Sequence, residues 1–164
     1  MKINSLYLAL SLLLFLCVSC QQDSKVVFDE FQSTTGIWDK NDVKTFVWDV
    51  QDTVTPANLF MNLRVNNEYP YSNMFVIFKI YKPSAAIVID TIQFQMADPN
   101  GTLLGNGFSD VKESKLWLKE NYVFDEKGKY KMTLEQAVRD LGDVEGVPTL
   151  KGVSEVGFRI EKAE

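Results

Sequence analysis

The sequence has 164 residues, 46% of them hydrophobic and 24% charged, with no histidine, two cysteines and a formal net charge of −5 at pH 7. A chain of this length can bury a sizeable core and predicts one domain. The acidic balance gives no electrostatic reason to bind nucleic acid or an anionic membrane surface, and the lack of histidine excludes catalytic sites that need an imidazole.

Residues 1–19 have the layout of a secretory signal. Lys2 supplies a positive start, and the uncharged stretch Leu6–Val18 follows it. As a helix, this stretch would span only about 20 Å, whereas the hydrocarbon core of a membrane is ~30 Å thick. The pattern therefore predicts a removable signal and no permanent membrane helix here.

The signal ends in Leu16–Cys20, sequence LCVSC, which resembles the lipobox of bacterial lipoproteins. A small residue precedes the acylated cysteine in that motif, so Ser19 selects Cys20. The departure is Cys17, which stands where leucine is usual. The resemblance implies cleavage before Cys20 and membrane attachment through acyl chains on it. The alternative is an ordinary signal peptide with two incidental cysteines.

Removal of the signal leaves no possibility of an intramolecular disulfide, because Cys17 is lost and Cys20 is acylated. The formal net charge then becomes −6, since Lys2 leaves with the signal. Residues 20–42 are predicted to form the lipidated N-terminus and a polar tether, part of which packs on the domain. The fold must rest on its hydrophobic core.

Residues 43–164 are predicted to form one β-rich domain, because apolar residues recur there with a period of two. Residues 73–82 are apolar on both faces, which predicts a central strand covered on both sides. Asp90 interrupts the alternation of residues 86–96 and predicts a bulge. The expected strands are 46–50, 58–66, 73–82, 86–96, 116–124, 129–132 and 152–161.

One short helix is predicted between the last two of these strands. Thr133 can act as its N-cap, with Gln136 completing a capping box, and Gly142 is a natural stop. Leu134, Val138 and Leu141 fall at helical spacing between them. The expected fold is therefore mainly β: an antiparallel β-sandwich, jelly-roll or immunoglobulin-like, with one short helix.

Few residues carry recognisable chemistry. No motif predicts a cofactor or a metal site, and nothing singles out two of the 22 acids for glycoside hydrolysis. Tyr69, Pro70 and Tyr71 lie in a polar loop and are candidate contacts for a protein or sugar partner, although the tyrosines could instead cap the edge of the sandwich. Thr53, in Asp52-Thr53-Val54, fits a short O-glycosylation motif of Bacteroidetes.

Three stretches together resemble the GldH family of gliding-motility lipoproteins from Bacteroidetes. They are residues 58–81 with YPYSN, 90–107 with LGNG, and 130–161 with EQAVR and GVSEVGFRIE. The resemblance implies a non-enzymatic envelope component of the gliding machinery, which is coupled to type IX secretion. Its partners would be other gliding and secretion lipoproteins or envelope proteins, and it offers no catalytic residues.

Two alternatives remain open. A carbohydrate-binding or substrate-capturing surface lipoprotein would use Trp38, Trp48 or Trp117 as sugar platforms, although the strand phase favours burial of Trp48 and exposure of Trp117. A carboxylate-dependent glycosidase would need two close acids in a cleft. The expected location is the outer membrane, and the single acid in Gln21-Gln22-Asp23 favours its periplasmic face over the cell surface.

Overall fold

The computed structural model describes residues 24–163 apart from 108 and 143, so the signal and Cys20 lie outside the described residues. The described part folds as strands, and it contains no helix long and apolar enough to cross a membrane. The strands are β1 (Val26–Ser33), β2 (Ile37–Asp39), β3 (Lys44–Val50), β4 (Ala57–Val65), β5 (Asn73–Tyr81), β6 (Ile87–Gln95), β7 (Lys112–Tyr122), β8 (Gly128–Gln136), β9 (Thr149–Lys151) and β10 (Val153–Lys162).

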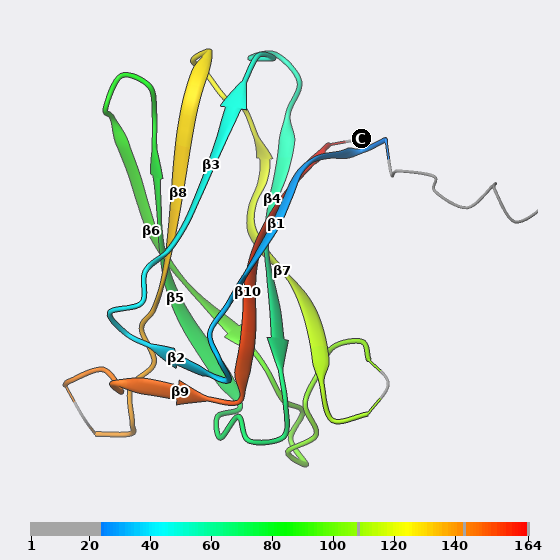
Figure 1. The fold of residues 1–164 in the computed structure, drawn as a ribbon, viewed down its shortest axis with the longest axis vertical. Helices are drawn as coiled ribbons and strands as arrows, with labels where there is room; N and C mark the ends of the chain where they lie inside the picture. Colours follow the sequence, from blue (N-terminus) through cyan, green and yellow to red (C-terminus); the bar gives the residue numbers. More distant parts are fainter. Residues whose placement is uncertain (1–23, 108, 143, 164) are drawn as a thin grey trace, which may run out of the picture.

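Two four-stranded antiparallel sheets form the body of the molecule (Figure 1). The strand order is β1-β10-β4-β7 in one sheet, called the first sheet below, and β3-β8-β5-β6 in the second sheet. β2 and β9 form a small third sheet at one end. This architecture confirms the predicted mainly β sandwich.

The core lies between the two large sheets and follows the period of two. Leu59, Met61 and Leu63 of β4 are fully buried, as are Val76 and Phe78 of β5. Alternate residues of a strand point to the same face, so these two central strands each supply one side of the core. Aromatic rings fill one part of it, where Trp48, Phe124, Tyr130 and Phe158 are in contact.

The sandwich begins at Val26 instead of residue 43, because β1 is an edge strand of the first sheet. It pairs antiparallel with β10, from Val26 opposite Glu161 to Ser33 opposite Glu155. The Lys162 N–H also donates to the Lys25 carbonyl at 2.9 Å. Most of the expected tether is thus part of the domain, and the start of β1 lies beside the end of β10 (Figure 1).

The helix predicted over 133–141 is wrong. Tyr130, Met132, Leu134 and Gln136 are all buried on one face of β8, which pairs with β3 on one side and β5 on the other. Glu135 binds Lys79 of the neighbouring strand at 2.6 Å and makes no helical pair. Burial of alternate residues and pairing on both sides outweigh the local capping signal.

Two finer expectations also fail. β6 pairs with β5 through Asp90 without a register shift, so the predicted bulge is absent from this strand. β5 is central in its sheet, yet no further layer from the described residues covers its outer face, where Phe75, Ile77 and Tyr81 are half-buried. Apolar residues on the outer face of a strand therefore did not indicate a third layer.

Candidate functional site: the two ends of the sandwich

The structure separates the candidate residues between two ends. The terminal end holds Lys25, Lys162 and the loop of residues 51–56. A hydrogen bond from the Ala163 N–H to the Pro56 carbonyl, at 2.9 Å, connects the end of the chain to this loop. The loop end holds β2, β9, the loop of residues 66–72 and the described residues of 97–111 and 137–148 (Figure 1). β1 runs from the terminal end to the loop end.

Tyr69 lies at the loop end, but its ring belongs to the core. Only 5% of Tyr69 is exposed, and its hydroxyl donates to the Asn73 carbonyl at 2.7 Å. Burial raises the pKa of the Tyr69 hydroxyl, so the group stays neutral. Its position removes Tyr69 from the surface that a partner could contact, and leaves it to support the loop from inside.

Tyr71 is half-buried against the core and keeps part of its ring at the surface, as does its neighbour Pro70. The Tyr71 ring packs edge-on against Tyr69, with 6.0 Å between the centroids, and its hydroxyl donates to Asp140 Oδ1 at 2.9 Å. Burial and then the bond to Asp140 raise the pKa of Tyr71. Pro70 is exposed beside it. The structure therefore presents Pro70 and Tyr71 on a rigid support.

Gly152 fixes this loop, although sequence reasoning assigned it no role. Its carbonyl accepts the Asn66 N–H at 2.8 Å, and its own N–H donates to the Gly36 carbonyl at 3.0 Å. Its φ is +76°, and a Cβ there would lie 2.3 Å from the Tyr69 nitrogen. Only glycine combines this conformation with so close an approach.

Exposed apolar side chains accompany Tyr71 at the loop end. They come from segments far apart in the sequence, so their periodicity could not reveal that they share one end. They are Ile37, Leu104, Leu141 and Val144.

The terminal end carries a hollow of about 460 Å³ on the outer face of the first sheet. Trp117 lines it with 49% of its surface exposed, and its ring packs at a tilt against Phe60 with 4.4 Å between the centroids. Trp38 and Trp48 are buried. Of the three candidate sugar platforms, Trp117 alone is available to a ligand.

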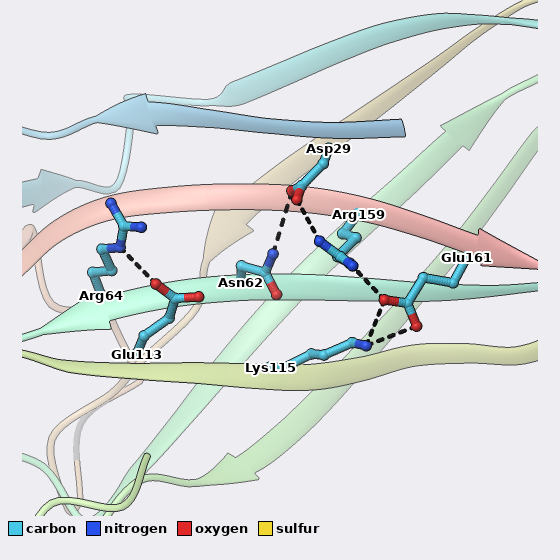
Figure 2. Close-up of polar contacts among 7 residues, drawn as sticks. All are labelled: Asp29, Asn62, Arg64, Glu113, Lys115, Arg159 and Glu161. Carbon is cyan, nitrogen blue, oxygen red and sulfur yellow. Dashed lines mark hydrogen bonds and ion pairs between the residues drawn. The ribbon is translucent and has the colours of Figure 1, made fainter. Parts of the chain in front are cut away.

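A network of charges crosses the same outer face (Figure 2). Arg159 of β10 binds Asp29 of β1 and Glu161 at 2.6 Å each, and Lys115 of β7 binds Glu161 at 2.7 Å. Burial alone would raise the pKa of Glu161, but the hydrogen bonds from Lys115 and Arg159 outweigh it and hold the pKa below its ordinary value. Glu161 is thus kept ionised and is not poised to donate a proton.

Thr53 lies half-exposed in the loop of residues 51–56 at the terminal end. Asp52 Oδ1 accepts the N–H groups of Val54 at 2.9 Å and Thr55 at 3.0 Å, which folds the loop around Thr53. Hydrogen bonds from the Thr55 hydroxyl and from these N–H groups lower the pKa of Asp52 to about 2. O-glycosylation of Thr53 remains a prediction.

Metal binding finds no support in the described part of the chain, where no group of three or more acidic, histidine or cysteine side chains is placed to hold an ion.

Comparison with known proteins decides the family. A family model described as GldH lipoprotein matches residues 26–160. The chain belongs to the GldH lipoprotein family. The gliding motility lipoprotein GldH of Flavobacterium johnsoniae is 48% identical over 163 residues, which covers 99% of this chain and 98% of that protein. A GldH homolog of Christiangramia forsetii is 49% identical over 142 residues, 87% of each chain. The resemblance seen in the sequence is thereby confirmed.

Two solved structures that match this GldH-family chain are distant likenesses. The VP2 subviral particle of infectious bursal disease virus matches with a TM-score of 0.35 and 14% identity, over 87% of this chain and 34% of that one. The structure of the Gx strain of the same virus gives a TM-score of 0.33 and 12% identity, over 82% and 30%. The chain spans about a third of the length of these viral chains.

Proposed function

We propose that this gliding-motility lipoprotein is a non-enzymatic component of a machinery coupled to type IX secretion, and that it acts through contacts with other gliding and secretion lipoproteins or envelope proteins. The observation that supports action through protein contacts is the arrangement of residues at the loop end. Pro70 and Tyr71 are presented there on the buried Tyr69, at the same end of the sandwich as several exposed apolar side chains. Rigid aromatic residues of this kind anchor protein interfaces.

Attachment is proposed to run through acyl chains on Cys20, with the domain on the periplasmic face of the outer membrane. The lipobox and the lipoprotein relatives support it. Cys20→Ser should leave an uncleaved or soluble protein, whereas Cys17→Ser should be processed normally. Membrane fractionation and intact mass measure both. Normal acylation of the Cys20 variant would refute the assignment.

The fold supports a division of labour between the two ends. Cys20 precedes the terminal end, and β1 leads away from it for eight residues, or about 26 Å at 3.3 Å per residue. An acyl chain on Cys20 would therefore hold one end of the domain. Tyr71 lies at the other end, where envelope proteins could reach it.

The direct test replaces both surface residues, in the variant Pro70→Ala/Tyr71→Ala. Tyr69 is left intact because replacing this buried residue could unfold the loop, and a loss of partner binding could then not be assigned to a lost contact. Ile89→Ala is the matched control, since Ile89 is 60% exposed on the outer face of the second sheet. The double variant should still unfold in one cooperative transition, at a lower melting temperature because Tyr71 packs on Tyr69 and bonds Asp140. It should lose about tenfold or more in recovery of gliding and secretion lipoproteins from solubilised envelope, as expected for an interface anchor. Equal recovery from all three proteins would remove this loop as the contact.

The second candidate function is carbohydrate capture, which the exposed Trp117 beside its hollow favours. If this function is correct, soluble oligosaccharides bind the native protein, and the Trp117→Ala variant no longer binds them. A glycan array with both proteins measures this.

A further inference from the structure

The hollow at the terminal end combines one exposed aromatic ring with several cations. Trp117 forms one wall, and Lys25, Lys115 and Lys162 line the rest. Lys115 Nζ also lies 4.0 Å from the centroid of the Phe60 ring, against which Trp117 packs at a tilt. Trp and Lys together suit the boundary between lipid and water, because the ring is apolar with a polar edge and the lysine stem reaches toward charge.

The length of chain before the hollow restricts what can occupy it. Lys25 lines the hollow and is five residues after Cys20. Five residues span at most about 18 Å when fully extended. If Cys20 is acylated as proposed above, the hollow is therefore held close to the lipid headgroups, which form a layer of roughly 5–8 Å on each side of the hydrocarbon core.

Exposed apolar side chains surround the same end. Val54 is 81% exposed in the loop of residues 51–56, and Val27 of β1 is also largely exposed. Neither contributes to the core. Together with Trp117 they give the terminal end apolar contacts that can enter the headgroup region.

The local charge also fits a phosphate. The whole chain is acidic, but the hollow is lined by three lysines and two glutamates, so its own balance is positive by one charge. Excess positive charge at this point attracts anionic headgroups.

We propose that this hollow docks on the membrane surface and binds the phosphate of a phospholipid headgroup, with Trp117 inserted beside it. The domain then stands on its terminal end and points the loop end away from the membrane. The inference rests on the proposed lipid at Cys20 but concerns a second, non-covalent contact.

The test uses Trp117 itself as the probe, because the other two tryptophans are buried. The mature chain has Cys20 as its single cysteine, so a maleimide phospholipid coupled to it replaces natural acylation and makes the result independent of processing. The conjugate is placed in vesicles of phosphatidylethanolamine and phosphatidylglycerol that contain a brominated phospholipid. We expect quenching of tryptophan emission and protection of Trp117 from acrylamide, and neither effect in Trp117→Phe.

The charge contribution is tested with Lys25→Glu/Lys162→Glu, which should lose at least half of the quenching. Lys151→Glu, on β9 at the loop end, is the matched control and should keep it. The proposal would be overturned if the conjugate is anchored in the vesicles, as vesicle flotation shows, while Trp117 stays unquenched and accessible to acrylamide. Quenching of Trp117 by chitotetraose without any effect of the vesicles would also overturn it, and would assign the hollow to sugar. Failure of natural acylation would appear separately, in the intact mass.

Discussion

Lys119 of β7 reaches across to Asp90 of β6, with 2.7 Å between Nζ and Oδ2. β6 and β7 are edge strands of opposite sheets, so the pair joins the two layers along one open side. Asp90 shares its face of β6 with Ile92 and Phe94, which places a charge on the inward face of an edge strand. Inward charges of this kind discourage pairing with another chain.

The Asp90–Lys119 pair should make stability depend on pH. The hydrogen bond from Lys119 is the largest cause that lowers the pKa of Asp90 below 3.8. The pair therefore stabilises the folded protein fully above pH 3.8, and this stabilisation is lost as the pH falls through the lowered pKa of Asp90 in the folded state. A double-mutant cycle with Asp90→Asn and Lys119→Met should give a coupling of about 0.2–1 kcal/mol at pH 7 and none in acid below the folded pKa. Urea unfolding measures it, and a coupling that persists in acid would contradict the assignment.

Phe78→Ala should lower the free energy of unfolding by about 3–5 kcal/mol, because it removes a fully buried ring from the centre of β5 and leaves a cavity. Gln93→Ala, on the outer face of the neighbouring β6, should change it by less than about 0.5 kcal/mol. Denaturant titrations compare the two. Equal losses would show that the register of the second sheet is wrong.

Gly152→Ala should destabilise the loop of residues 66–72 beyond the strain of its backbone conformation. Gly101 is the matched control, since its φ of +89° is similar but nothing lies within 4 Å of an added Cβ. Gly101→Ala should cost about 1–2 kcal/mol from strain alone. Gly152→Ala should cost clearly more, because the new Cβ meets backbone. Similar melting temperatures for the two variants would argue against the close approach to Tyr69.

Asp52 should titrate with a pKa of about 2 in the folded protein. Thr55→Val removes the largest cause, the hydroxyl hydrogen bond, and should raise this pKa toward 3.8. Carboxyl carbon shifts followed by NMR between pH 7 and acid measure both proteins. An unchanged Asp52 titration in the variant would show that the loop around Thr53 is held in another way.

Whether an element could be predicted from the sequence depends on how far apart along the chain the residues lie whose interactions decide its structure. β4 and β5 were predictable because burial of one face imposes a local period of two, visible in Leu59–Met61–Leu63 and Val76–Phe78. The segment around Leu134 carried both a helical and an alternating pattern, and only pairing with β3 and β5 chose between them. β1 was missed as a strand for the same reason, since its partner β10 is at the other end of the chain.

The candidate site was harder to predict than the fold. Tyr69 and Tyr71 are two residues apart and equally aromatic, yet one is buried and the other lies at the surface, because the Asn73 carbonyl and the close backbone of Gly152 draw Tyr69 inward. The charges of Asp29 and Arg159 meet across 130 positions of sequence. No local pattern encodes such distant contacts.

The pairing of β1 with β10 also has a mechanical consequence. A pull between a lipid on Cys20 and a partner at Tyr71 would act along the axis of β1, which runs from the terminal end to the loop end. The inter-strand hydrogen bonds lie across that axis, so they would be loaded in shear and together, from Val26 to Ser33, instead of opening one after another. If the domain stands between the membrane and its partners, as proposed, this pairing would let it carry tension without separating strand by strand from its anchored end.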